Sequence, residues 1–182
     1  NFIYLSINLL AVTLIFHRYI LSFFPVSRKG LLRILAVGAA CFALYWVLSL
    51  VLGNFLGLLD PEFTNKNDQA ISGMIEVNYP LMFVSTVILA PITEECFFRG
   101  LIFRGLYDRS PAAAWIVSVS VFSAIHLLGY IGTLSPLALA VSFMQYLPAG
   151  LCLAAGYRLS GSLLCPILIH AAVNTVGMLV VR

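Results

Sequence analysis

The stretch ITEECFFRGLIF, residues 92–103, places two adjacent carboxylates and an arginine inside a segment that is otherwise apolar. Glu94 and Glu95 have apolar runs on both sides that are typical of a membrane span. A charged side chain within a bilayer is costly unless it is paired, hydrated or protonated. The stretch therefore indicates a membrane protein that builds a polar site inside its apolar core.

The composition of the whole chain supports this interpretation. Of its 182 residues, 62% are hydrophobic and 9% are charged, whereas a soluble domain carries roughly 25% charged residues. The net charge of +3 is small and no basic cluster is dense, so we expect no nucleic-acid partner. Because the chain begins at Asn1 beside an apolar run, we interpret it as a fragment or a processed form.

Run length predicts an all-α fold, namely a polytopic transmembrane helix bundle of about six spans with an intramembrane polar cavity. The predicted spans are Phe2–Phe24, Leu31–Leu59, Tyr79–Phe103, Ala112–Ile131, Leu134–Tyr157 and Ser162–Val181. Pro148 and Gly150 predict a kink in the fifth span. We divide the chain into residues 1–78, with N-terminal helices and an outer loop, and a core of residues 79–182 that holds the polar groups.

Basic residues in the short connections predict the orientation in the membrane. They follow the first, third and fifth spans, as Arg28, Lys29, Arg33, Arg104, Arg109 and Arg158. The connection 60–78 instead holds four acidic residues and one lysine. The basic connections are therefore expected in the cytoplasm and the start of the chain outside. Residues 60–78 are expected to form a mobile surface loop or a short interfacial helix.

Few ionisable groups remain within the spans. Glu95 and Arg99 are four positions apart, so they can pair on one helix face. Glu94 is rotated by about 100° from Glu95 and has no partner on its own helix. The candidate partners from other spans are His126, His170 and Asn174, of which the last two are one turn apart. His126 lies about two turns from the middle of its span, so that span is expected to tilt or to begin later.

Each feature also has a simpler interpretation. Taken alone, Glu95 and Arg99 fit a structural ion pair, and His126 fits an interhelical hydrogen bond. The aromatic side chain of Phe122 fits packing, and Gln145 and Tyr146 fit polar packing or at most the lining of the cavity. The cysteines Cys41, Cys96, Cys152 and Cys165 fit small buried apolar side chains better than disulfides, zinc ligands or a nucleophile. The occurrence of three polar motifs in one apolar chain nevertheless favours a site.

These motifs resemble those of a known family. Glu94-Glu95-x-x-x-Arg99, Phe122-x-x-x-His126 and His170-x-x-x-Asn174 are similar, in this order, to the motifs of the CPBP family of type 2 CaaX prenyl proteases and bacteriocin-processing intramembrane proteins. The resemblance covers residues 79–181, whereas residues 1–78 show no motif. It implies an intramembrane endopeptidase in which Glu94 is the general base and His126 helps to hold the attacking water. His170 and Asn174 would stabilise the oxyanion, with Glu95, Arg99 and Phe122 as supporting residues.

Several alternatives stay open. Peptide hydrolysis needs an activated water, a donor to the carbonyl oxygen and a proton for the leaving amine, which these side chains can supply without a metal cofactor. A zinc-dependent metalloprotease would instead use Glu94, His126 and His170 as a His₂Glu ligand set, although no HExxH motif is present. A non-catalytic bacteriocin-immunity or membrane-binding protein is a further alternative, as is a transporter.

The expected partners are the lipid bilayer and a membrane-associated peptide or protein substrate. The expected location is a multi-pass protein of a prokaryotic cell membrane, or of the endoplasmic reticulum membrane if the source is eukaryotic.

Overall fold

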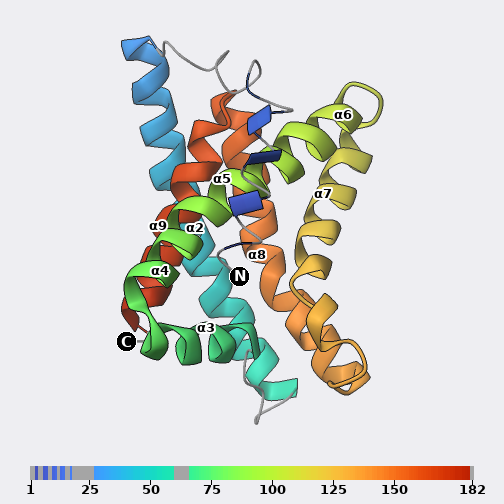
Figure 1. Ribbon diagram of the computed structural model, residues 1–182. Coiled ribbons are helices and arrows are strands. Elements are labelled where there is room, and N and C mark those ends of the chain that lie inside the picture. The colour runs from blue at the N-terminus through green and yellow to red at the C-terminus, as the bar shows by residue number, and fades with distance from the viewer. Residues whose placement is uncertain are drawn as a thin grey trace.

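A computed structural model of the chain describes residues 27–59 and 66–180, together with eight isolated positions before them (Ile3, Ser6, Ile7, Leu10, Ala11, Thr13, Leu14 and His17). The described residues form helices joined by short connections, and they include no strand (Figure 1). The prediction of an all-α membrane bundle is therefore confirmed. Most of the predicted first span, Phe2–Phe24, lies outside the described residues.

Three of the described helical runs are long and apolar enough to cross a bilayer. They are α2 (Arg28–Leu59), the run Tyr79–Tyr107 and α8 (Pro136–Ser160). At 1.5 Å per residue, α2 is about 48 Å long, which exceeds the ~30 Å thickness of the hydrocarbon layer. Two apolar helices are shorter, α7 (Pro111–Ile125) and α9 (Leu164–Val180). The second, third, fifth and sixth predicted spans thus correspond to observed helices.

The run Tyr79–Tyr107 alternates between α-helical and π-helical geometry. Its segments are α4 (Tyr79–Phe83), the π-helix η1 (Val84–Leu89), α5 (Ala90–Glu95), the π-helix η2 (Cys96–Phe103) and α6 (Arg104–Tyr107). At the end of η1 the N–H of Ala90 donates to the carbonyl of Ser85, five residues earlier. The next donor in this register would be Pro91, which has no N–H. The carbonyl of Thr86 is therefore open to a donor from elsewhere, and π-helical turns of this kind are frequent at functional sites.

The starts and ends of the other helices follow from local sequence. Ser110 and Ser135 cap α7 and α8, because each hydroxyl accepts the N–H three residues later and a proline follows each serine at the first helical position. Helix α8 ends at Ser160 and is followed by Gly161, which has a φ of 73°. Glycine adopts this left-handed conformation at lower cost than other residues, because it has no Cβ.

The fourth predicted span, Ala112–Ile131, is wrong at its C-terminal end. Helix α7 ends at Ile125 after 15 residues and is followed by a turn and the short 3₁₀ helix η3 (Leu128–Tyr130). The last four carbonyls of a helix have no helical donor, and the ring of His126 bonds to one of them, that of Phe122. His126 therefore lies at the end of a short helix, and neither a tilt nor a later start is needed to explain its position.

Helix α8 is the centre of the bundle, because it packs against α2, α7 and α9. The main core consists of buried side chains from these helices and from η2, namely Ile34, Cys41, Phe98, Phe122, Cys152, Leu153, Cys165 and Ile169. At Gly156 of α8, an added Cβ would lie 2.6 Å from Cδ1 of Ile169 on α9. A larger residue at this position would force the end of the Ile169 side chain to shift, so the close packing of α8 against α9 favours glycine. All four cysteines are free and buried, as predicted.

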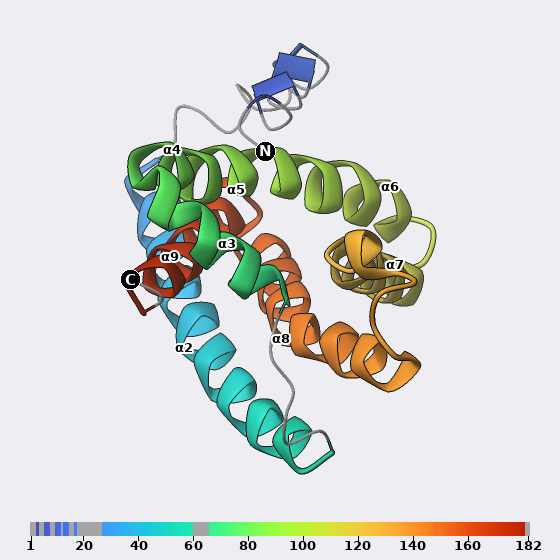
Figure 2. The same ribbon diagram turned by 60° about the horizontal axis from the view of Figure 1, so that its bottom comes forward.

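The connection between α2 and α4 contains a helix, α3 (Lys66–Val77). Of the two alternatives for residues 60–78, the helical one is therefore correct for most of the segment. Figures 1 and 2 show α3 beside α4 and next to the far end of α9, whereas α6 lies at the other end of the bundle. The basic connection after α6 and the connection containing α3 are thus on opposite ends of the molecule, as the charge pattern predicted.

Candidate active site

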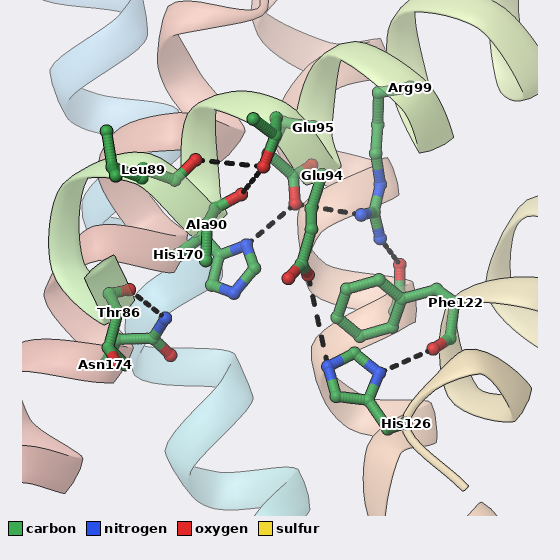
Figure 3. Close-up of polar contacts among 12 residues, drawn as sticks. Thr86, Leu89, Ala90, Glu94, Glu95, Arg99, Phe122, His126, His170 and Asn174 are labelled. Carbon is green, nitrogen blue, oxygen red and sulfur yellow. Dashed lines mark hydrogen bonds and ion pairs between the residues drawn. The ribbon is translucent and has the colours of Figure 1, made fainter. Parts of the chain in front are cut away.

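Glu95 is the centre of a buried polar network that joins α5, η2 and α9. Its Oε1 accepts hydrogen bonds from Nη1 of Arg99 and from Nδ1 of His170, both at 2.9 Å (Figure 3). The side chains of Glu95 and Arg99 are both 0% exposed. The predicted Glu95–Arg99 pair is confirmed, and His170 joins it from a position 75 residues further along the chain. Because a carboxylate accepts, Nδ1 of His170 is the donor in this bond.

Arg99 also connects this network to α7 and α8. Its Nη2 donates to the carbonyl of Gly150 at 3.0 Å, and its guanidinium carbon lies 4.7 Å from the centre of the Phe122 ring. A guanidinium at this distance from an aromatic face is attracted by the ring's electrons. The sequence alone indicated only a packing role for Phe122. In the structure the face of its ring also contacts the buried guanidinium of Arg99.

Glu94 faces His126 rather than the Glu95 network. Its Oε2 lies 3.9 Å from Nε2 of His126, and the two side chains are 27% and 18% exposed, respectively. Nδ1 of His126 lies 2.7 Å from the carbonyl oxygen of Phe122, which can only accept, so Nδ1 carries the hydrogen. Nε2 is therefore the nitrogen turned toward Glu94. Of the three candidate partners of Glu94, His126 is the one in ion-pair distance, whereas His170 bonds to Glu95.

Two aromatic rings contact the imidazole of His126. Phe122 lies 4.8 Å away at a tilt of 55°, and Tyr146 of α8 is stacked at 4.4 Å with an interplanar angle of 23°. The sequence interpretation treated Tyr146 as packing or lining and missed this contact. In the sequence, the only indication at this position was a tyrosine inside an apolar span. Such tyrosines are too common to indicate a site.

Asn174 contacts the π-helical part of the run Tyr79–Tyr107. Its Nδ2 donates to the carbonyl of Thr86 at 2.7 Å, the carbonyl for which Pro91 offers no N–H. The amide has two hydrogens, so a second N–H of Asn174 is not engaged in this bond. The contact spans 88 positions of sequence and was not predicted.

The candidate residues thus come from four elements, α5, η2, α7 and α9, and Figure 3 shows the side chains of Glu94, Glu95, His126 and His170 in one region. Among the residues that the structure describes, no three His, Cys, Asp or Glu side chains form a group that could hold a metal ion.

A family model described as type II CAAX prenyl endopeptidase Rce1-like matches residues 76–176, more than half of the chain. The chain belongs to the Rce1-like family. The matched segment contains every candidate site residue from Glu94 to Asn174, and membership confirms the resemblance on which the sequence interpretation relied. This Rce1-like protein is accordingly a membrane protein of a protease family.

The chain is also similar to two curated proteins, one of which is named as a membrane peptidase. The Rce1-like chain is 29% identical over 175 residues to an Escherichia coli protein named "Uncharacterized 24.3 kDa protein", covering 94% of this chain and 75% of the relative. It is 36% identical over 63 residues to the Bacillus subtilis protein named "Putative membrane peptidase YdiL", covering 34% of this chain and 25% of the relative. No solved structure matches the chain.

Proposed function

We propose that this Rce1-like protein is an intramembrane endopeptidase that cleaves a membrane-associated protein or peptide with a water activated by Glu94. The observation that carries the proposal is the pair formed by Oε2 of Glu94 and Nε2 of His126, 3.9 Å apart. This distance is too long for a direct hydrogen bond and suits a bridging water.

The protonation of His126 defines how a water would be held. Because Nδ1 donates to the carbonyl of Phe122, neutral His126 presents a lone pair at Nε2. A water between Glu94 and His126 can donate one hydrogen to each, which leaves its own lone pairs for the substrate carbonyl carbon. As the new C–O bond forms, Glu94 takes the proton from the water, and it then returns that proton to the amine nitrogen when the C–N bond breaks.

His170 and Asn174 are the proposed donors to the oxyanion. Since Nδ1 of His170 donates to Glu95, donation to the substrate must come from Nε2, which requires the doubly protonated imidazolium. Glu95 holds Nδ1 at 2.9 Å and so fixes which nitrogen of His170 can face the substrate. Asn174 would contribute the N–H that is not bonded to Thr86. Donors placed before the reaction stabilise the developing charge without reorganisation.

The substrate, the membrane and the cofactor requirement complete the proposal. The family description makes prenylated CAAX peptides the first substrates to test. The bacterial source of both relatives supports a prokaryotic cell membrane, and the long apolar helices support a chain that crosses it several times. We propose that the reaction needs no metal, so activity should survive removal of divalent ions, whereas the zinc-dependent alternative requires its loss.

The test is peptide cleavage by the purified protein in detergent, with quenched prenylated and unprenylated peptides. Glu94→Gln keeps the shape of the side chain but removes the base, so we expect kcat to fall by ~10²- to 10⁴-fold. The matched control is Glu76→Gln, which changes an exposed acid on α3, away from the site. Turnover by Glu94→Gln close to that of the wild type would refute the assignment of Glu94 as the base.

A further inference from the structure

The ring of His126 is held by contacts from α7 and α8. His126 is the first residue after α7, and its ring bonds through Nδ1 to the carbonyl of Phe122. One hydrogen bond fixes the position of one nitrogen, but the second side-chain torsion of histidine has a broad energy minimum. The ring can therefore still pivot about that bond, which would move Nε2 away from Glu94.

Tyr146 is the side chain that opposes this pivot. It comes from α8 and lies nearly parallel to the imidazole, with ring centres 4.4 Å apart. The imidazole cannot rotate its edge toward the stacked Tyr146 ring without a steric clash. The tilted Phe122 ring, whose centre lies 4.8 Å from that of the imidazole, blocks rotation in another direction. The imidazole is thus confined by one hydrogen bond and two aromatic contacts.

One turn after Tyr146, contacts at Gly150 define the position of α8. Gly150, four residues after Tyr146, accepts a hydrogen bond from the buried Arg99 at 3.0 Å. An added Cβ at Gly150 would lie 3.0 Å from Cγ1 of Val119 and 3.5 Å from Cδ1 of Phe122. Helices α7 and α8 are therefore in close contact beside the site, and this contact brings Tyr146 within stacking distance of His126.

We propose that Tyr146 is a positioning residue for peptide hydrolysis, whose ring stacks on the imidazole of His126 and keeps Nε2 directed at Glu94. This inference rests on the proposed function, because it assigns to His126 a part in holding the attacking water. Tyr146 acts through His126 and needs no contact with the substrate. Its loss should therefore lower kcat and leave KM nearly unchanged.

The experiment compares three variants in the peptide-cleavage assay. Tyr146→Leu removes the ring, and we expect kcat to fall by ~10- to 100-fold, since a displacement of about 1 Å at a reacting group has effects of this size. Tyr146→Phe restores the ring and should recover most of the lost kcat. The matched control is Tyr157→Leu, 11 residues further along the same helix. Its ring packs against Phe103, with ring centres 5.9 Å apart.

A double-mutant cycle tests whether Tyr146 acts through His126. In a His126→Ala background, Tyr146→Leu should cause no further loss of kcat. Three results would each overturn the inference. The first is an equal loss of kcat in Tyr146→Leu and Tyr157→Leu, and the second is a loss of kcat that adds to that of His126→Ala. The third is a Tyr146→Phe variant as impaired as Tyr146→Leu. Full kcat in Tyr146→Leu beside an inactive Glu94→Gln would refute this inference alone, whereas an active Glu94→Gln would refute the proposed function itself.

Discussion

Replacing Glu95 with glutamine should destabilise the fold, because it leaves a buried cation without its counter-charge. Arg99 is 0% exposed and pairs with Glu95 at 2.9 Å. Removing one partner of a buried ion pair costs about 3–5 kcal/mol of unfolding free energy. Glutamine keeps an oxygen that can accept from Nδ1 of His170, so the change removes the charge and little else.

A compensating substitution separates the charge from the shape. In the double variant Glu95→Gln/Arg99→Met both charges are absent, and replacing a buried pair by neutral groups is often close to neutral in stability. The carbonyl of Gly150 then loses its donor from Arg99, at about 1–3 kcal/mol. We therefore expect the double variant to be about 2 kcal/mol more stable than Glu95→Gln.

The assay is denaturant unfolding in detergent micelles, followed by circular dichroism. Glu94→Gln is the matched control, one residue away. Its side chain is 27% exposed and its Oε2 lies 3.9 Å from His126, beyond hydrogen-bond distance, so its loss of stability should stay below about 1 kcal/mol. If Glu95→Gln unfolds at the same denaturant concentration as the wild type, or if the losses of Glu95→Gln and Arg99→Met simply add, the buried ion pair does not hold these helices.

Three further outcomes are expected. Gly156→Ala should lower the free energy of unfolding by about 1–3 kcal/mol through overpacking. Adding Ile169→Val, which removes the atom 2.6 Å from the added Cβ, should recover part of this loss. A double variant no more stable than Gly156→Ala would contradict the packing argument. Activity should survive dialysis against a chelator, whereas elemental analysis showing about one zinc per chain, with activity lost on chelation and restored by zinc, would establish the metalloprotease alternative. A cysteine introduced as Asp68→Cys should react with an impermeant reagent outside intact cells, and labelling only after permeabilisation would reverse the orientation.

The features that the sequence predicted correctly depend on residues close together in the chain. The apolar runs identified the helices because each helix bonds its backbone within itself and needs apolar side chains to lie in lipid. The Glu95–Arg99 pair was predictable because residues four apart face each other on one helix. The motif order also led to the family. The end of α7 was missed because it depends on how the ring of His126 bonds back to Phe122.

The contacts between different helices of the site were decided by tertiary structure alone. His170 reaches Glu95 across 75 positions, and Asn174 reaches Thr86 across 88. No local pattern encodes these distances, because they depend on how closely α9 packs against its neighbours. The stacking of Tyr146 on His126 likewise depends on the contact of α7 with α8. Sequence by itself determined which polar groups the membrane must shelter, since burying each has a cost that only a partner can offset. The packing of the helices determined which partner each one meets, because hydrogen bonds and ring contacts form only within a few ångströms.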